Sequence, residues 1–137
     1  MATGDISRRK ETFIATEGQR HQSPIPTGVK AGGFVYLSAV LPVNPISQDV
    51  ASDDPEAQVR QVFENIQAAL KVAGATMGDV VKVGIYMRDL SERSALNKVW
   101  LDYFPTEAPA RFAVQVVDLG GPGGKSRFMA DVTALAP

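Results

Sequence analysis

The amino-acid sequence predicts an α+β fold in which two helices pack on one face of a mixed β-sheet. Three observations support this class. The element order is strands, helix, strand, helix, strands; each helix has a single apolar face; and the remaining runs are β-branched or alternate between apolar and polar residues. Two one-sided helices can bury their apolar faces together against one face of a sheet. With 137 residues and no internal repeat, the chain fits one domain, expected over residues 10–137 after a flexible N-terminal arm over residues 1–9.

The N-terminal third predicts two strands separated by a loop. We expect a first strand over residues 11–16 and a loop over residues 18–30, which contain two prolines and two glycines. The apolar run at residues 34–38 predicts a short buried strand. Prolines at positions 42 and 45 end this strand, and a polar loop follows.

The first helix has the clearest signals in the chain. Asp53 or Asp54 can cap its N-terminus, Pro55 suits the first helical position, and Glu56 favours the positive end of the helix dipole. Gly74 ends the helix. Between these signals the apolar residues recur at steps of three and four and form one stripe: Val59, Val62, Phe63, Ile66, Ala69, Leu70 and Ala73.

The middle of the chain predicts a strand followed by a second helix. Residues 80–87 are rich in β-branched side chains, which favours a strand. Asp89 and Glu92 have the spacing of a capping box. The helix that follows ends before Pro105, and we expect its aromatic residues to belong to the core. One face of this helix is apolar: Leu96, Val99, Trp100 and Tyr103.

The C-terminal third predicts two strands joined by a turn. We expect strands over residues 111–119 and 127–135. The glycine-rich segment at residues 120–125 lacks the glycine-lysine-serine/threonine spacing of a phosphate-binding loop and does not open a helix. A tight hairpin turn is therefore the favoured interpretation of this segment.

The composition excludes several classes of protein. The net charge of −1 provides no positive field for nucleic acid or anionic lipid, and the absence of cysteine excludes thiolate catalysis and Cys-ligated zinc. His21 is the single histidine, and we expect it on the surface of a loop. The basic N-terminus lacks the apolar core of a secretory signal, and no apolar run is long enough for a membrane span. We expect a soluble cytoplasmic domain.

Arg111 is the strongest candidate for a binding residue. It stands directly before an alternating apolar strand, where a guanidinium is costly to bury unless an anion or a carbonyl meets it. Its planar fork suits a carboxylate, and Asp131 in the last strand can position water beside it. Two alternatives remain open. Arg111 can be a structural ion-pair residue with Glu107, Asp118 or a neighbouring subunit, and Asp131 can face solvent on an edge strand.

Five segments together resemble the reactive-intermediate deaminase (Rid, or YjgF) family. The resemblance runs in register from about Ser23 to Ala136, which is most of the chain. No single segment is decisive, but all five occur in the family's order and spacing: residues 36–45 (YLSAVLPVNP), 61–66 (QVFENI), 79–83 (DVVKV), 97–104 and 109–111 (PAR).

The resemblance implies a chorismate-mutase-like α+β fold assembled as a homotrimer, with one pocket in each cleft between subunits. Deaminase members of the family hydrolyse enamines and imines, such as 2-aminoacrylate and its tautomer, to a 2-keto acid and ammonia. They use no metal and no organic cofactor. The expected partners are therefore a small carboxylate substrate and other copies of the chain, with neither nucleic acid nor membrane involved.

Four residues match pocket positions of the family. Arg111 matches the arginine that holds the substrate carboxylate, and Ala113 falls where a backbone group beside that arginine contacts the substrate. Ser38 and Asn97 fall on positions near the cleft, although a lone asparagine on a helix can also simply face solvent.

Three positions depart from the family pattern. Asp131 replaces the glutamate that positions water, Ile25 replaces a pocket tyrosine, and Ala39 replaces a glycine. Because aspartate is one methylene shorter, its carboxylate falls short by roughly 1.5 Å, and a misplacement of about 1 Å can cost on the order of 100-fold in rate. These changes predict a weaker deaminase or a different substrate, such as a longer aminomuconate-like dicarboxylate. The rival function is a non-catalytic protein that binds or senses a 2-keto acid on the same scaffold.

Overall fold

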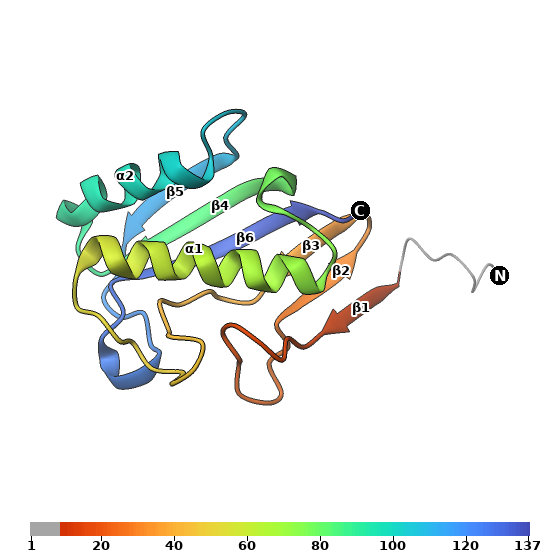
Figure 1. Cartoon of the computed structure of the whole chain (residues 1–137), viewed down its shortest axis with the longest axis horizontal. Helices are drawn as coiled ribbons and strands as arrows, with labels where there is room; N and C mark the ends of the chain where they lie inside the picture. The colour runs from red at the N-terminus through yellow and green to blue at the C-terminus, as the bar shows by residue number, and fades with distance from the viewer. Residues whose placement is uncertain (1–8) are drawn as a thin grey trace.

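The computed structural model describes residues 9–137, so residues 1–8 of the predicted arm lie outside the described residues. Six strands form one mixed sheet in the order β1-β2-β3-β6-β4-β5 (Figure 1). All neighbouring strands are antiparallel except β4 and β5, which are parallel. The strands are β1 (Lys10–Phe13), β2 (Gly28–Ala31), β3 (Phe34–Leu37), β4 (Val80–Met87), β5 (Ala110–Gln115) and β6 (Phe128–Leu135).

Two helices, α1 (Pro55–Val72) and α2 (Arg93–Tyr103), lie on one face of this sheet and contact each other. Figure 1 shows α1 crossing in front of the central strands and α2 lying toward the β5 edge. Residues 9–137 also contain three short 3₁₀ turns: η2 (Met77–Asp79), η3 (Leu90–Glu92) and η4 (Pro122–Gly124). Within residues 9–137, neither helix has the length and apolar character to span a membrane. The α+β class with two helices on one face is thus confirmed.

The predicted signals of α1 are all confirmed. Asp54 is the N-cap, because its side-chain oxygen accepts a hydrogen bond from the Ala57 N–H at 2.9 Å, and Pro55 is the first helical residue. Every residue of the predicted apolar stripe is buried. Phe63 lies at the centre of the packing between the helices, with its ring 5.2 Å from that of Tyr103 and 6.0 Å from that of Trp100. The aromatic residues of α2 therefore belong to the core, as expected.

The sequence did not predict β2, because the prolines and glycines of residues 18–30 indicate a loop. Residues 28–31 instead form β2, which pairs with β3 through a two-residue turn. Gly32 and Gly33 have φ values of 58° and 85°, the left-handed conformation that a tight hairpin requires at both central positions. This glycine pair was the available signal for a hairpin. The first strand is also shorter than expected and ends at Phe13.

The predicted hairpin between the last two strands is wrong. β5 and β6 do not pair with each other, because β4 lies between them in the sheet. The glycine-rich segment contains η4 and is a connection that crosses the end of β4. β5 ends at Gln115 and is an edge strand in this chain, so Arg111 does not lie in a buried strand. β6, in contrast, is a central strand, so Asp131 is not on an edge.

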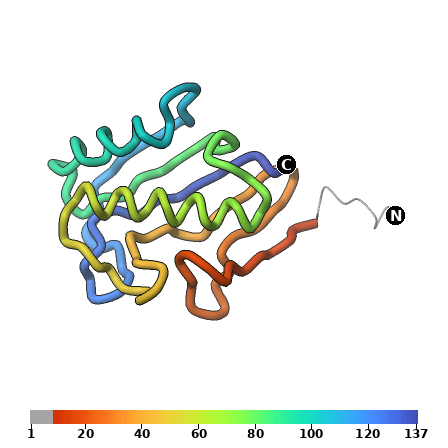
Figure 2. The backbone as a smooth tube through the Cα atoms, in the orientation of Figure 1, coloured from red at the N-terminus to blue at the C-terminus, as the bar shows by residue number. Residues whose placement is uncertain are grey.

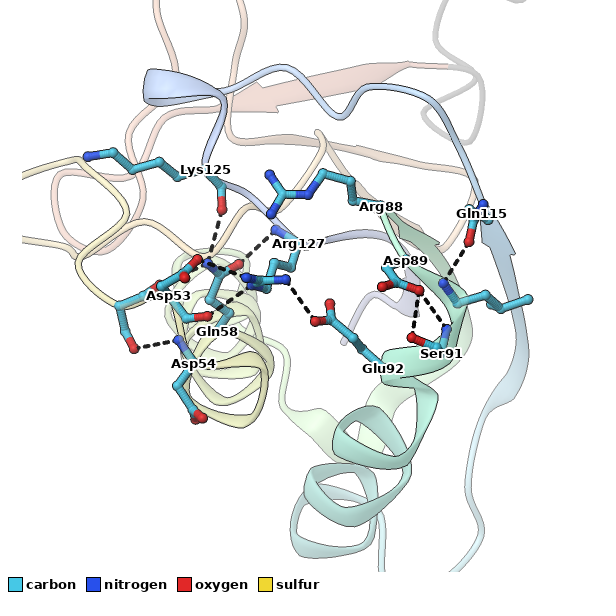
Figure 3. A network of polar contacts seen from close by, with 12 residues as sticks. Asp53, Asp54, Gln58, Arg88, Asp89, Ser91, Glu92, Gln115, Lys125 and Arg127 are labelled. Carbon is cyan, nitrogen blue, oxygen red and sulfur yellow. Dashed lines mark hydrogen bonds and ion pairs between the residues drawn. The ribbon is translucent and has the colours of Figure 1, made fainter.

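The predicted capping box at Asp89 and Glu92 does not form. Asp89 accepts from the Ser91 N–H inside η3, whereas the Glu92 carboxylate contacts the Arg127 guanidinium at 2.7 Å (Figure 3). Arg127 also contacts the Asp53 carboxylate at 3.0 Å. This network connects the start of α1, the start of α2 and the start of β6. Glu92 therefore pairs with Arg127 from a distant segment of the chain and does not form the local capping box.

Candidate functional site

Arg111 lies at the edge of the sheet on the face that carries the helices. Val83, its neighbour on β4, is fully buried under those helices, and this register turns the Arg111 side chain toward α2. The guanidinium carbon lies 4.9 Å from the centre of the Trp100 ring, a cation–π arrangement. Its Nη2 donates a hydrogen bond of 2.7 Å to Asn97 Oδ1. Two residues of α2 thereby hold the guanidinium in place.

The positive charge of Arg111 has no carboxylate partner among the described residues. Neither Glu107 nor Asp118 forms an ion pair with it within residues 9–137. Burial lowers the pKa of the guanidinium below its ordinary value, and the positive charge of Arg93 acts in the same direction. A half-buried cation with most of its donors unused is suited to bind an anion from outside the chain. The Asn97 side chain is exposed, but it also accepts a hydrogen bond from Arg111 and so has a role within the site.

Ala113 lies on the same face as Arg111, because it follows two residues later on β5 and pairs with buried Ile85. Arg111, Asn97 and Ala113 therefore form one half of a site, which we call the cationic half. Phe112 and Val114 point to the opposite face of the sheet, where the Phe112 ring covers Gly84. A Cβ at Gly84 would come within 2.4 Å of that ring, so glycine is required for this close approach.

Asp131 lies on the face of the sheet that has no helices. It pairs with Gly84, whereas its neighbours Ala130 and Val132 are fully buried beneath the helices. Since Arg111 points to the helical face, the structure places the two proposed catalytic residues on opposite faces of one sheet. They are not brought together within a single chain. Asp131 is exposed, and it is free to meet a group from another chain.

Ser38, Ala39 and Ile25 lie on the same side of the molecule as Asp131. The Val40–Ala130 bridge places Ala39 next to Asp131, and both residues are exposed. The Ser38 hydroxyl donates to the Pro26 carbonyl at 2.8 Å, which fixes the loop that carries Ile25. Ile25 is half exposed. These four residues form the second half of a site, which we call the acidic half.

Two residues that the sequence analysis did not assign to the site hold the acidic half in position. His21 Nε2 lies 2.8 Å from the Ala39 carbonyl, and because a carbonyl only accepts, this nitrogen must carry the proton. Gln19, which is buried, also donates to the Ala39 carbonyl and accepts from the Leu41 N–H at 2.9 Å. His21 thus lies in a loop, as expected, but it is half-buried and contacts the acidic half.

A cavity of 630 Å³ opens beside the acidic half. Ile25 of the acidic half lines it, and so does His21, which contacts the Ala39 carbonyl. Its other walls come from three separate loops: Gln19, Arg20, Gln22, Leu41, Val43, Gln48, Gly121 and Pro122. No sequence pattern predicted this cavity, because its loops meet only in the folded chain.

Comparisons with known proteins agree with the fold. The model of the family described as endoribonuclease L-PSP matches residues 22–126. A RutC family protein of Pyrococcus horikoshii is 35% identical over 107 residues, which are 78% of this chain and 85% of that protein. The crystal structure of YyfA, a Rid family protein from Yersinia pestis, is 32% identical with a TM-score of 0.86, and the match covers 93% of this chain and 99% of YyfA. RidA from an Antarctic Psychrobacter is 31% identical with a TM-score of 0.83, over 91% of this chain and 98% of RidA.

Proposed function

Because this chain belongs to the endoribonuclease L-PSP family, which includes the YjgF and Rid proteins, we propose that it hydrolyses carboxylate-bearing 2-imino or enamine acids to 2-keto acids and ammonia. The observation that carries this proposal is Arg111. Its guanidinium is stacked on Trp100, oriented by Asn97 and free of any acidic partner within residues 9–137. A substrate carboxylate can supply the missing negative charge through two parallel hydrogen bonds.

The proposed reaction is the addition of water to an imine. Arg111 binds the carboxylate and stabilises the negative charge that develops beside the reacting carbon. Asp131 orients a water molecule whose oxygen forms a bond to the imine carbon, and the proton released moves to the nitrogen. The added hydroxyl then transfers its proton to the nitrogen as the carbon–nitrogen bond breaks, so ammonia leaves and the carbonyl of the 2-keto acid forms. A conjugated imine is already electrophilic, so orientation of the two reactants supplies much of the rate.

We further propose that the site is completed between subunits of a homotrimer. Arg111 and Asp131 lie on opposite faces of the sheet, so the cationic half of one chain must meet the acidic half of another. The face without helices supports such an assembly, since it exposes a row of large apolar and aromatic side chains. These residues include Tyr36, Phe112, Val114 and Leu135.

Ribonuclease activity, named in the family description, is not part of this proposal. The chain has a net charge of −1, which provides no positive field for the phosphate backbone. Its single histidine is bound to the Ala39 carbonyl. A guanidinium suited to a carboxylate, on a chain with a net charge of −1, favours a small acid over a polynucleotide.

The test is the release of ammonia and 2-keto acid from 2-aminoacrylate generated in situ. We expect wild type to accelerate release and Arg111→Ala to lose at least about 100-fold in kcat/KM, because both a charge-assisted contact and its orientation are lost. Arg111→Lys should not restore activity, since an ammonium lacks the planar fork. Arg60→Ala, which removes an exposed arginine from α1, is the matched control and should remain active.

Two results would contradict the proposal. Full activity of Arg111→Ala would remove Arg111 from the mechanism. A folded wild-type protein that binds 2-keto acids but releases no ammonia from any imino acid would favour the rival binding function.

A further inference from the structure

The cavity beside the acidic half has an unusual charge for a pocket in a slightly acidic protein. Three loops form it, over residues 19–25, 41–48 and 121–122, and they lie together along the lower side of the molecule in Figure 2. None of the ten lining residues is aspartate or glutamate. Arg20 is the one permanently charged residue among them, and the remaining polar walls are amides and an imidazole.

Arg20 is held in place without being neutralised. Its guanidinium donates to the carbonyls of Thr16, Gly18 and Pro45 at 3.2–3.4 Å. Gln48 accepts from the Arg20 backbone N–H at 2.8 Å and donates to two of the same carbonyls. Within the described part of the chain, no carboxylate forms an ion pair with Arg20. The cavity therefore presents a fixed, uncompensated positive charge.

The cavity also adjoins the acidic half, with which it shares one residue. Ile25 belongs both to the acidic half and to the cavity wall. His21, another wall residue, contacts the carbonyl of Ala39, which neighbours Asp131. A substrate that reacts at Asp131 can thus extend past Ile25 toward Arg20. A group at that far end meets the positive charge of Arg20 and no carboxylate on the cavity wall, which favours an anion.

We propose that this cavity is a subsite for a second carboxylate, so that the preferred substrates are elongated dicarboxylic imino acids. This inference rests on the proposed function, because it assigns the far end of the same substrate. Arg111 binds the carboxylate next to the imine carbon, and Arg20 attracts the distal one. Apolar contacts with Ile25 and Leu41 accommodate the methylene groups between them.

The experiment compares substrates that differ only in the distal carboxylate. Imines are generated in situ from norvaline and glutamate, and from the seven-carbon pair 2-aminoheptanoate and 2-aminopimelate. We expect wild type to favour the dicarboxylate by about tenfold or more in kcat/KM for at least one pair, the factor that a single well-placed charge contact provides. Gln22→Glu, which places a negative charge at the cavity wall, should remove this preference, and the ratio of dicarboxylate to monocarboxylate kcat/KM measures the loss.

Two further variants separate the charge effect from structural damage. Gln67→Glu makes the same change on an exposed position of α1 outside the cavity and should keep the preference. Arg20→Gln should lose the preference while remaining folded by circular dichroism. Binding of 2-oxopentanoate and 2-oxoglutarate, and of their seven-carbon equivalents, is measured by calorimetry in the same variants.

The outcomes distinguish this subsite from the proposed function. A dicarboxylate preference in binding that Gln22→Glu abolishes supports the subsite even when no imine is hydrolysed, and in that case only the deaminase assignment fails. Hydrolysis with equal rates and equal affinities for both members of each pair overturns the subsite and leaves the deaminase intact. A preference that survives both Gln22→Glu and Arg20→Gln, or no binding of any of the acids, also overturns it.

Discussion

At the scale of single residues, the cationic half shows how a charge is kept available for a ligand. Trp100 supplies a flat surface for the Arg111 guanidinium, and Asn97 supplies a neutral acceptor at 2.7 Å. A carboxylate at the position of Asn97 would orient the arginine equally well but would neutralise it. The neutral amide therefore fixes the geometry and leaves the charge for the substrate.

This interpretation predicts the effect of Asn97→Asp. The new carboxylate should form an ion pair with Arg111 and raise KM for a 2-imino acid by about tenfold or more, because the substrate must displace an internal anion. Steady-state kinetics checks this result, with Gln67→Glu on α1 as a control for the added charge. An unchanged KM would show that the Arg111 charge does not attract the substrate.

At the scale of elements, α1 anchors the network that joins the three segments around Arg127. Its N-terminus is fixed twice, by the Asp54 cap on the Ala57 N–H and by buried Gln58. Gln58 donates to the carbonyls of Ser52 and Lys125 and accepts from the Arg127 N–H at 2.7 Å. The start of this helix thus positions the glycine-rich connection, whose residues Gly121 and Pro122 line the cavity.

The cap predicts a measurable change in stability. Asp54→Ala should lower the free energy of unfolding by about 1 kcal/mol, because it leaves an N–H at the helix start without its acceptor. Asp54→Asn should differ from wild type by only a few tenths of a kcal/mol, since asparagine is an equally good cap. Urea unfolding at one fixed protein concentration measures both variants. Equal losses in the two would assign the effect to the negative charge and not to the cap hydrogen bond.

At the scale of the whole molecule, the sheet separates the two halves of the site. The alternation of side chains along β5 and β6 turns Arg111 toward the helices and Asp131 away from them. No rearrangement of side chains can bring them together without breaking the sheet. The proposed reaction therefore requires a second copy of the chain.

Mixing two inactive variants tests this requirement. Arg111→Ala and Asp131→Ala should each be inactive alone, but hybrids formed by refolding them together should regain about a quarter of wild-type activity in an equal mixture with random assembly. The recovery is expected because some sites combine the intact arginine of one chain with the intact aspartate of another. Ammonia release before and after mixing measures it. Hybrids that form but stay inactive would place both residues in one site of one chain.

Local sequence signals determined the elements whose residues interact with near neighbours. Asp54, Pro55 and the apolar stripe defined α1, and the β-branched run at residues 80–87 coincided with β4. Arg111 was identifiable as a candidate because a guanidinium beside an apolar strand demands a partner. Five ordered segments were sufficient to indicate the family. In each case the physical cause acts over a few residues, or through a spacing that the sequence displays directly.

The tertiary structure alone decided which distant segments meet. Glu92 does not cap its own helix because Arg127, 35 residues away in the sequence, provides a charged partner. β5 and β6 do not form a hairpin because β4 lies between them in the sheet. The cavity around Arg20 exists only because three loops converge, which no local pattern encodes. The placement of Arg111 and Asp131 on opposite faces likewise follows from strand register. Register is fixed by burial of one face against the helices, and that burial is a property of the folded chain.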